Sequence, residues 1–296
     1  MSRWLIAGAG GMLGQDLVAV LCDQGEDVIG LSRPDLDITD EAAVRTALRR
    51  GRPDVVVNCA AWTAVDDAEA NEDRALDVNG RGAAYLAAGC AALGLPLMHM
   101  STDYVFAGDA SRPYAESDPA RPRTAYGRTK LAGERAVRLL LPETGYVVRT
   151  AWLYGAHGRN FVSAMIGLER ERPTAEVVAD QRGQPTWTVD VAGKLVALIR
   201  SRAAAGVYHA TSSGEATWFD LAREVFRLLG ADPGRIRATT SGSYIRPAVR
   251  PGYSVLGHDA WAAAGLAPIG DWRLSLRRAF PALRAAAEAA RTSADG

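Results

Sequence analysis

A tyrosine and a lysine four residues apart are the pair in this sequence best suited to transfer a proton. Tyr126 and Lys130 stand at positions i and i+4, which share one face of a helix. A free phenol has a pKa of about 10, and a neighbouring ammonium favours the phenolate and lowers that pKa. The spacing therefore predicts a proton-transferring Tyr126 whose pKa is lowered by Lys130. A pair of surface side chains on an amphipathic helix is the alternative for this motif alone.

A hydroxyl side chain precedes this pair at the end of a predicted strand. Thr102 directly follows the strand expected at residues 97–101. Ligands gather at the carboxyl ends of the strands in open parallel sheets. We therefore expect Thr102 to hydrogen-bond the reacting oxygen and to act together with Tyr126 and Lys130.

A glycine-rich turn near the start of the chain indicates a nucleotide. Gly8, Gly11 and Gly14 form a GxxGxxG pattern between a predicted strand and a predicted helix. Glycines there permit a tight turn, backbone contact with a pyrophosphate and close helix–strand approach, and the helix N-terminus presents free amides to the anion. The pattern predicts a nicotinamide dinucleotide whose hydride attacks a carbonyl carbon while Tyr126 protonates the oxygen. Lys130 would also hold the nicotinamide ribose; a merely flexible turn is the alternative.

The end of the second predicted strand bears on the choice of cofactor. An acid at this point would bind the adenosine ribose and repel a 2′-phosphate. The chain has Ser32 and Arg33 there, and a hydroxyl and a guanidinium suit the phosphate of NADPH. We therefore expect NADPH, with NADH possible. An Arg33 that merely faces solvent is the alternative.

The order of apolar runs predicts the elements that position these residues. Short apolar runs alternate with helical patterns, which is typical of βαβ units. We predict an α/β fold, a Rossmann-type doubly wound parallel sheet with a smaller C-terminal substrate-binding domain. Residues 1–155 would bind the dinucleotide, with later segments returning to this domain, and residues 156–296 would mainly bind the substrate. The predicted strands are 4–7, 27–31, 55–58, 97–101 and 146–149; the predicted helices are 13–22, one beginning at 39–41, 79–93, 126–141, 218–229 and a terminal helix before a frayed tail at 292–296.

Composition narrows the partners. The 34 Lys and Arg residues balance 34 Asp and Glu residues, so nothing predicts a nucleic-acid or membrane partner. The 3 cysteines are isolated, which is typical of a reduced cytoplasmic protein rather than of disulfides or a metal site. We expect a cytoplasmic protein.

Several runs of the sequence resemble the dTDP-4-dehydrorhamnose reductases, a branch of the extended short-chain dehydrogenases/reductases. The likeness covers nearly the whole chain, and the STDYVF run is more specific to this branch than the YxxxK motif. The runs are GAGGMLG at 8–14, NCAAWTAVD at 58–66, STDYVF at 101–106, YGRTKLAGE at 126–134, RTAWLY at 149–154, DQRGQPT at 180–186 and the stretch 246–256.

The resemblance implies the NAD(P)H-dependent reduction of the 4-keto group of dTDP-4-dehydro-L-rhamnose to dTDP-L-rhamnose. It implies that Thr102, Tyr126 and Lys130 form the catalytic triad and that Thr102 and Asp103 touch the sugar. Trp152 matches a tryptophan that faces the sugar nucleotide, with a core indole as the alternative. The implied cofactor contacts are Gly11, Met12 and Leu13 at the pyrophosphate, Asp37 and Ile38 beside the adenine, and Ala61, Trp62 and Thr63 along the groove.

The remaining expectations concern the substrate's nucleotide end and the assembly. Arg246 and Arg250 are candidates for the diphosphate because guanidinium groups match phosphate oxygens; ordinary surface arginines are the alternative. Some relatives dimerise with a bound magnesium ion, so a homodimer is possible, but no clear acidic cluster predicts a metal here. Some members carry an acid where this chain has Ser32, which puts a preference for NADH in doubt without excluding the use of both cofactors.

Three further functions fit the same motifs. A sister ketoreductase for another dTDP-4-keto sugar, of the antibiotic deoxysugar or streptose type, would use the same machinery. A sugar-nucleotide epimerase shares the glycine turn and YxxxK but would show no net NADPH consumption. A cofactor-binding regulatory subunit is the third, which the intact Thr102, Tyr126 and Lys130 disfavour.

Overall fold

The carboxyl ends of a parallel sheet position the residues that were predicted to do chemistry. The computed structural model describes residues 1–292. Its 6-stranded sheet has the order β10-β5-β4-β3-β1-β2, and the predicted doubly wound parallel sheet is confirmed. The order reverses between β1 and β3, and the crevice outside such a pair is where nucleotides bind. The strands are β1 (Arg3–Ala7), β2 (Asp27–Leu31), β3 (Val55–Asn58), β4 (Leu97–Thr102), β5 (Gly145–Thr150) and β10 (Gly206–His209).

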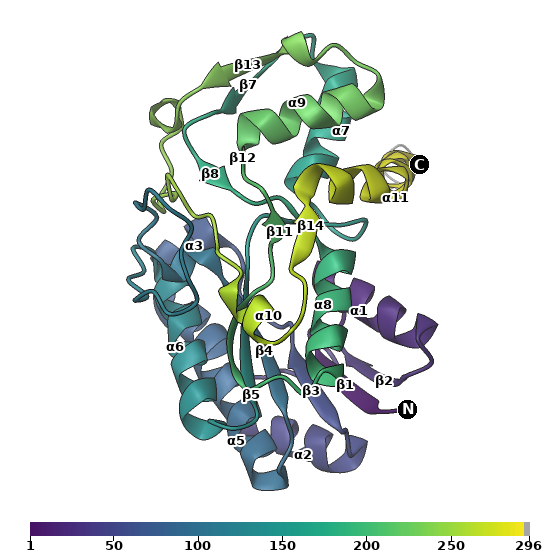
Figure 1. Ribbon diagram of the computed structural model, residues 1–296, viewed down its shortest axis with the longest axis vertical. Coiled ribbons are helices and arrows are strands. Elements are labelled where there is room, and N and C mark those ends of the chain that lie inside the picture. Colours follow the sequence, from purple (N-terminus) through teal and green to yellow (C-terminus); the bar gives the residue numbers. More distant parts are fainter. Residues whose placement is uncertain (293–296) are drawn as a thin grey trace.

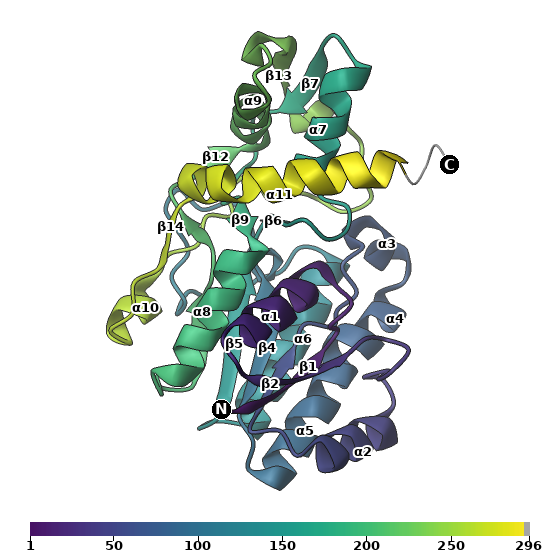
Figure 2. The ribbon, with the colours of Figure 1, turned by 90° about the vertical axis from the view of Figure 1, so that its right-hand side faces the viewer.

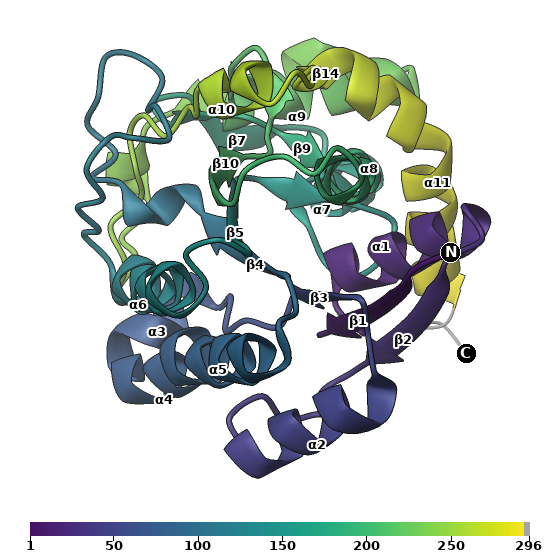
Figure 3. The ribbon, with the colours of Figure 1, turned by 60° about the horizontal axis from the view of Figure 1, so that its bottom comes forward.

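Helices cover both faces of this sheet (Figures 2 and 3). Leu17 of α1 (Met12–Asp23) and Leu195 of α8 (Thr188–Arg200) belong to the core on one face. The core on the other face includes side chains of α2 (Glu41–Gly51), α5 (Ala83–Leu93) and α6 (Ala125–Leu140). Because both faces are covered, every residue of β3, β4 and β5 is buried, which explains the apolar run at 55–57 in β3.

The predicted elements form where local chemistry favours them. Each predicted strand in the first 150 residues agrees with the observed one to within one residue at either end. The predicted start of α2 is confirmed, because the Asp40 carboxylate accepts hydrogen bonds from the amides of Ala42 and Ala43 at 2.9 and 3.0 Å. α9 (Trp218–Leu229) ends at Gly230, whose φ of 77° suits a glycine.

One predicted helix begins differently. Residues 79–82, expected as regular helix, belong to a π-helical turn (Asp77–Gly82) between α4 (Glu72–Leu76) and α5. The buried Asn79 amide turns there to hydrogen-bond both backbone groups of Trp62 and the Thr129 hydroxyl. A single π-helical turn of this kind often accompanies a functional site.

A second, smaller core lies above the sheet in Figure 1. It is built from α7 (Phe161–Glu171), α9 and α11 (Trp272–Thr292), with the parallel pair β7 (Ala175–Val178) and β13 (Ile236–Thr239). The chain passes between the two cores several times, since α8, β10 and α10 (Asp259–Ala263) pack with the sheet. The division into domains at residue 155 stays a prediction. The predicted frayed tail falls, from residue 293 on, outside the described residues.

Short elements complete the chain. They are α3 (Val65–Ala70), β6 (Leu153–Tyr154), β8 (Arg182–Gly183), β9 (Thr186–Trp187), β11 (Ser212–Ser213), β12 (Ala216–Thr217), β14 (Ile269–Asp271) and the 3-10 turns Asp103–Val105, Pro233–Arg235 and Ser241–Ser243. Within the described part of the chain, no helix has both the length and the apolar character that crossing a bilayer requires.

A buried ion pair fixes α6 to the sheet. Arg149 of β5 donates to Glu134 of α6 at 2.9 and 2.7 Å, and the two side chains are only 4% and 2% exposed. The hydroxyl of Ser101 on β4 donates to the same carboxylate at 2.5 Å. Glu134 lies on the helix that carries Tyr126 and Lys130. The ion pair therefore determines where these two residues lie relative to the carboxyl ends of the strands.

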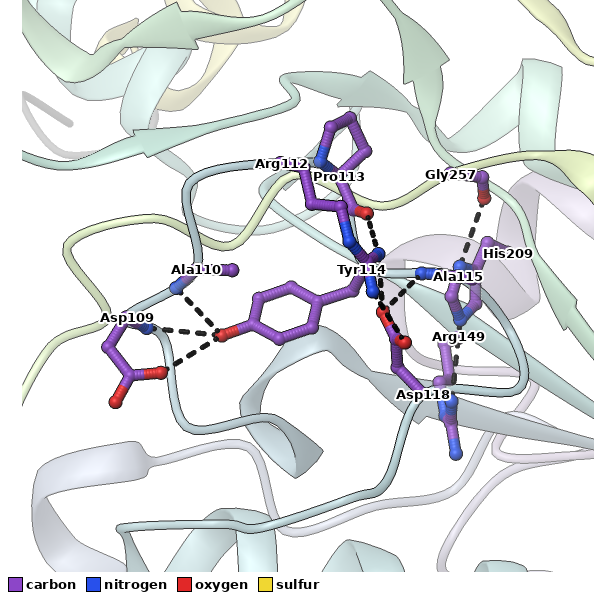
Figure 4. A network of polar contacts seen from close by, with 10 residues as sticks. All are labelled: Asp109, Ala110, Arg112, Pro113, Tyr114, Ala115, Asp118, Arg149, His209 and Gly257. Carbon is purple, nitrogen blue, oxygen red and sulfur yellow. Dashed lines mark hydrogen bonds and ion pairs between the residues drawn. The ribbon is translucent and has the colours of Figure 1, made fainter.

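The loop between β4 and α6 is held by a second polar network (Figure 4). The Tyr114 hydroxyl accepts hydrogen bonds from the backbone amides of Gly108, Asp109 and Ala110 at 3.0 to 3.2 Å. Arg112 binds both carboxylate oxygens of Asp118 at 2.8 and 2.9 Å. This loop therefore reaches the start of α6 as an ordered segment.

Two glycine-to-alanine changes test how closely α6 packs. A methyl group on Gly133 would collide with the carbonyl oxygen of Asn79 in the π-helical turn, whereas one on Gly193 of α8 would meet nothing within 4 Å. We expect Gly133→Ala to lower the free energy of unfolding by about 1–3 kcal/mol. Gly193→Ala should raise it by about 0.4–1 kcal/mol. Urea unfolding of both variants measures this, and equal effects would contradict the packing described.

Candidate functional site

A cavity of about 790 Å³ opens between the carboxyl ends of the sheet and the second core. Its walls come from the ends of β4 and β5, from α6, α7 and α9, and from the segment 241–254. The predicted site residues that line it are Thr63, Thr102, Asp103, Tyr126, Trp152, Arg246 and Arg250. The structure therefore brings the predicted substrate residues and two members of the predicted triad to one cavity.

Tyr126 stands in the first turn of α6, beside the end of β4. Thr124 caps the start of this helix, because its hydroxyl accepts a hydrogen bond from the Gly127 amide at 3.1 Å. The Tyr126 ring packs edge-to-face on Tyr104, with 5.5 Å between the ring centroids. Burial raises the pKa of Tyr126 to about 12, although a hydrogen bond with Thr102 opposes this shift and the Asp103 charge adds to it. The phenol pKa is therefore raised, not lowered as the YxxxK motif predicts, and Tyr126 is protonated at neutral pH.

Lys130 lies one turn further along α6 and is buried beneath the cavity wall. Its Nζ donates to the carbonyl oxygen of Met100 on β4 at 2.6 Å and lies 3.5 Å from Nε2 of His99. Burial lowers the pKa of Lys130 to about 8, against the opposing effects of Glu134 and Cys59. The alternative of a surface pair is excluded, because the side chains of both Tyr126 and Lys130 are buried.

Asp103 is a buried acid that faces the cavity. Its Oδ1 accepts a hydrogen bond from the Thr102 hydroxyl at 2.9 Å, while Oδ2 has no hydrogen-bond partner within residues 1–292. Burial raises the pKa of this carboxyl to about 6, and the nearby Ser254 and Thr102 hydroxyls oppose the shift. Asp103 can therefore bind a ligand hydroxyl in either protonation state.

The glycine turn has the shape of a phosphate cradle. Gly8 has a φ of 78°, and a Cβ there would lie 2.5 Å from the Ala60 nitrogen; a Cβ on Gly14 would collide with the Gly8 carbonyl. No side chain caps the start of α1 at Gly11, and the first turn of α1 carries no acidic residue that would repel an anion. The amides of Met12, Leu13 and Gly14 at this helix end therefore suit an anion.

The segment after β3 lies against the glycine turn, since a Cβ on Gly8 would meet the backbone of Cys59 and Ala60. It carries the predicted residues Ala61, Trp62 and Thr63. The Asn79 side chain accepts a hydrogen bond from the Trp62 amide at 2.9 Å and donates one to the Trp62 carbonyl oxygen at 3.1 Å. Asn79 was not predicted, because nothing in its own sequence neighbourhood indicates which loop its amide reaches.

The tip of β2 holds an acid that the sequence pattern did not indicate. Both the amide and the hydroxyl of Ser32 donate to Asp35 Oδ2, at 2.9 and 2.5 Å. Arg33 is exposed. Hydrogen bonds from Thr39 lower the pKa of Asp37, and the Arg33 charge adds to this shift. A guanidinium and a carboxylate thus stand together where the adenosine ribose is expected. Ile38 is only 4% exposed and packs against Gly82, so it belongs to the core below this site.

Trp152 forms half of a stacked indole pair. Its ring lies parallel to that of Trp218 at 3.6 Å, with 6° between the planes, and both rings line the cavity. Trp152 has a φ of 48°, and the close approach of its ring leaves no space for a side chain at Gly183. The indole of Trp218 donates to Gln181 at 3.1 Å. Trp152 is therefore part of a stacked pair at the cavity wall and not an indole of the core. Trp218 was not predicted as a site residue, because it lies far from Trp152 in the sequence.

The two predicted arginines meet a shared acid at the cavity rim. Asp66 Oδ2 accepts from Arg250 at 2.8 Å and from Arg246 at 3.3 Å, while Oδ1 accepts from the Ala248 amide at 3.2 Å. Asp66 thereby ties the segment 246–250 to α3. The described residues contain no group of three or more His, Cys, Asp or Glu side chains that could hold a metal ion.

Comparisons with known proteins agree with this geometry. Residues 2–285 match the family model described as the RmlD substrate binding domain. The chain is 58% identical over 283 residues to the dTDP-4-keto-6-deoxy-D-glucose reductase of Streptomyces niveus, covering 96% of this chain and 98% of that one. It is 58% identical over 285 residues to the dTDP-4-dehydrorhamnose reductase of Streptomyces griseus, covering 95% and 94%. A solved dTDP-4-dehydrorhamnose reductase from Bacillus anthracis in complex with NADP has a TM-score of 0.91 and 35% identity, covering 94% of this chain and 98% of that one.

The raised pKa of Asp103 predicts a pH-dependent stability. The folded pKa of about 6 exceeds the ordinary value of 3.8, so the contribution of Asp103 to stability is greatest below pH 4 and is lost as pH rises through 6. Asp103→Asn removes this loss, because the amide has no charge to bury. We expect the stability of the variant relative to the parent to increase by about 2–3 kcal/mol between pH 4 and pH 7.5.

Urea unfolding at both pH values measures this difference. Asp35→Asn is the matched control, because the pKa of that exposed carboxyl is lowered by Ser32 and its pH effect has the opposite sign. A stability difference that is the same at both pH values would contradict the burial of a charged Asp103.

Proposed function

The chain belongs to the dTDP-4-dehydrorhamnose reductase family, and from this premise we propose that it uses NADPH to reduce dTDP-4-dehydro-L-rhamnose to dTDP-L-rhamnose. The observation that carries the proposal is a buried Tyr126, whose pKa is raised, beside Thr102 at the wall of a cavity large enough for a sugar nucleotide. A reductase needs this acid, because a carbonyl oxygen gains negative charge when a hydride adds to the carbon.

The side chains divide the reaction between them. A bound NADPH supplies a hydride to the 4-keto carbon. Tyr126 donates its proton to the same carbonyl's oxygen, and its raised pKa keeps it protonated until the oxygen becomes a stronger base. Thr102 would turn its hydroxyl hydrogen from Asp103 to that oxygen, and Lys130 would hold the nicotinamide ribose. Two electrons and two hydrogens thus convert the ketone into an alcohol.

The remaining predicted residues hold the two nucleotides. For the cofactor, the uncapped α1 N-terminus with Gly8, Gly11 and Gly14 suits the pyrophosphate. Ser32 and Arg33 suit a 2′-phosphate, although Asp35 beside Ser32 leaves room for use of NADH. For the substrate, Asp103 and Trp152 would contact the sugar.

Arg246 and Arg250 are proposed to bind the substrate's diphosphate. Both are already paired with Asp66, so the diphosphate must share or replace this acid. Since Arg250 is only 19% exposed in its side chain, it is the better preorganised of the two.

A sister 4-ketoreductase is the second candidate function. The relative named for dTDP-4-keto-6-deoxy-D-glucose is as similar to this chain, at 58% identity, as the relative named for dTDP-4-dehydrorhamnose. A panel of dTDP-4-keto sugars, each offered with NADPH and NADH, would identify the sugar by the loss of nicotinamide absorbance at 340 nm, a general property of the reduced cofactor. NMR of the product would then give the configuration at C4.

An epimerase and a regulatory subunit would each give a different result in this panel. The epimerase would turn over a sugar nucleotide without net loss of NADPH, and the regulatory subunit would bind NADPH without turnover. A homodimer and a cytoplasmic location stay predictions; light scattering on the purified chain tests the first, and cell fractionation tests the second.

The proton donor is tested by Tyr126→Phe, which removes only the hydroxyl. We expect kcat to fall by about 10²–10⁴-fold, while the NADPH dissociation constant changes little. The matched control is Tyr146→Phe, whose hydroxyl donates to Ala203 and which is absent from the cavity lining. Near-normal turnover of Tyr126→Phe in a 340 nm assay would overturn the assignment.

The cofactor preference is tested by Arg33→Ala. We expect the KM for NADPH to rise about tenfold, as the loss of one charge-assisted hydrogen bond would give, while the KM for NADH changes little. Asp35→Asn is the opposite control, because it removes a negative charge beside the same site and should favour NADPH. Equal effects of Arg33→Ala on both cofactors would refute a 2′-phosphate site here.

A further inference from the structure

A row of buried polar side chains lies directly beneath the site. It runs from Asn58 at the end of β3 through His99 on β4 to Lys130 on α6, and none of the three is more than 2% exposed. The Asn58 amide nitrogen lies 3.1 Å from His99 Nδ1, and His99 Nε2 lies 3.5 Å from Lys130 Nζ. Of the three, only Lys130 has a part in the proposed reaction.

The backbone determines which way the Asn58 amide points. Its Oδ1 accepts a hydrogen bond from the Ala60 amide at 3.0 Å, so its NH₂ group must face His99. Nδ1 of His99 is then the acceptor of that NH₂ group. A proton on Nδ1 of His99 would place an N–H donor opposite the Asn58 NH₂ group, which is also a donor, so this tautomer is disfavoured.

The imidazole therefore has one allowed tautomer. Burial and the Lys130 charge lower the pKa of His99 well below its usual value, so the ring is neutral. With Nδ1 accepting, its single proton is on Nε2 and points at Lys130 Nζ. The ring cannot move away easily, because the space at Gly133 is so narrow that a Cβ there would lie 3.0 Å from Nε2.

We propose that His99 is a positioning residue for Lys130: its Nε2–H offers Nζ no acceptor, which leaves the lysine hydrogens for the Met100 carbonyl oxygen and the cofactor ribose. An ammonium cannot donate to a nitrogen that itself carries a hydrogen, so the side of Nζ that faces His99 forms no competing hydrogen bond. The inference rests on the proposed function in one respect, the role of Lys130 at the ribose.

The same contact acts on the charge of the lysine. An N–H dipole that points at Nζ disfavours the ammonium, in the same direction as burial. The groups that face Lys130 are His99 and the Met100 carbonyl from β4, Cys59 after β3 and Glu134 from its own helix. Cys59 is neutral, because burial raises its pKa to about 12, and Glu134 is paired with Arg149. His99 is therefore the neighbour whose removal changes the environment of Nζ most selectively.

Two amide substitutions separate positioning from packing. In His99→Gln the carboxamide nitrogen replaces Nε2, whereas in His99→Asn it replaces only Nδ1 and cannot reach Lys130. We expect His99→Gln to keep kcat and the alkaline limb of the kcat/KM profile close to those of the parent. We expect His99→Asn to lose about tenfold in kcat and to move the alkaline limb upward by about one pH unit. A parent-like profile in His99→Asn, or equal losses in both variants, would overturn the proposal.

A second measurement does not depend on activity. The chain has only 4 histidines, so ¹⁵N NMR of the histidine-labelled protein, with His99→Gln to assign the signal, gives the tautomer of His99 directly. We expect the Nε2–H form at pH 7; the Nδ1–H form would overturn the proposal even if neither variant could be assayed. If the parent oxidised NADPH with none of the keto sugars, the proposed function would fail while the tautomer still tested His99.

Discussion

The buried ion pair between Glu134 and Arg149 is the interaction on which the site depends. It joins α6 to β5, and Ser101 adds β4 to the same carboxylate. Removal of one partner would leave an unpaired buried charge, which costs about 3–5 kcal/mol. Because Thr102 follows Ser101 while Tyr126 and Lys130 lie on the helix of Glu134, the same contact determines how closely the hydroxyl, the phenol and the ammonium approach one another.

Burial then determines the chemistry of these groups. It raises the pKa of Tyr126 and Asp103 and lowers that of Lys130, so each is shifted toward its neutral form. A neutral phenol carries the proton that reduction consumes, as the sequence predicted for Tyr126, but its raised pKa makes it a weaker acid than the motif predicted. No cation is among the groups that set the pKa of Tyr126, so the cavity favours its protonated form.

The sequence predicted those features of the fold and the site that depend on residues close together in the chain. The glycine turn, the strand ends and the i, i+4 pair follow from spacings of a few residues, and their elements formed as expected. The missed residues act through distant partners: Asp66 meets Arg250, which is 184 positions away, and Asn79 meets Thr129, which is 50 positions away. Asp35 is the exception: its hydrogen bonds with Ser32 are local, but only the residues directly after the strand entered the prediction, and Asp35 lies four residues past the end of β2. The direction of the Tyr126 pKa shift also required the fold, because only the fold determines burial.

Hydride transfer to a sugar carbon is the central claim, and isotope transfer tests it most directly. NADPH carrying deuterium at the transferable position of its nicotinamide would be incubated with the protein and dTDP-4-dehydro-L-rhamnose, and the product examined by NMR. We predict one deuterium at C4 of dTDP-L-rhamnose for each NADPH oxidised. A product with hydrogen at C4, or turnover of the sugar without oxidation of NADPH, would contradict hydride transfer from the cofactor to this carbon.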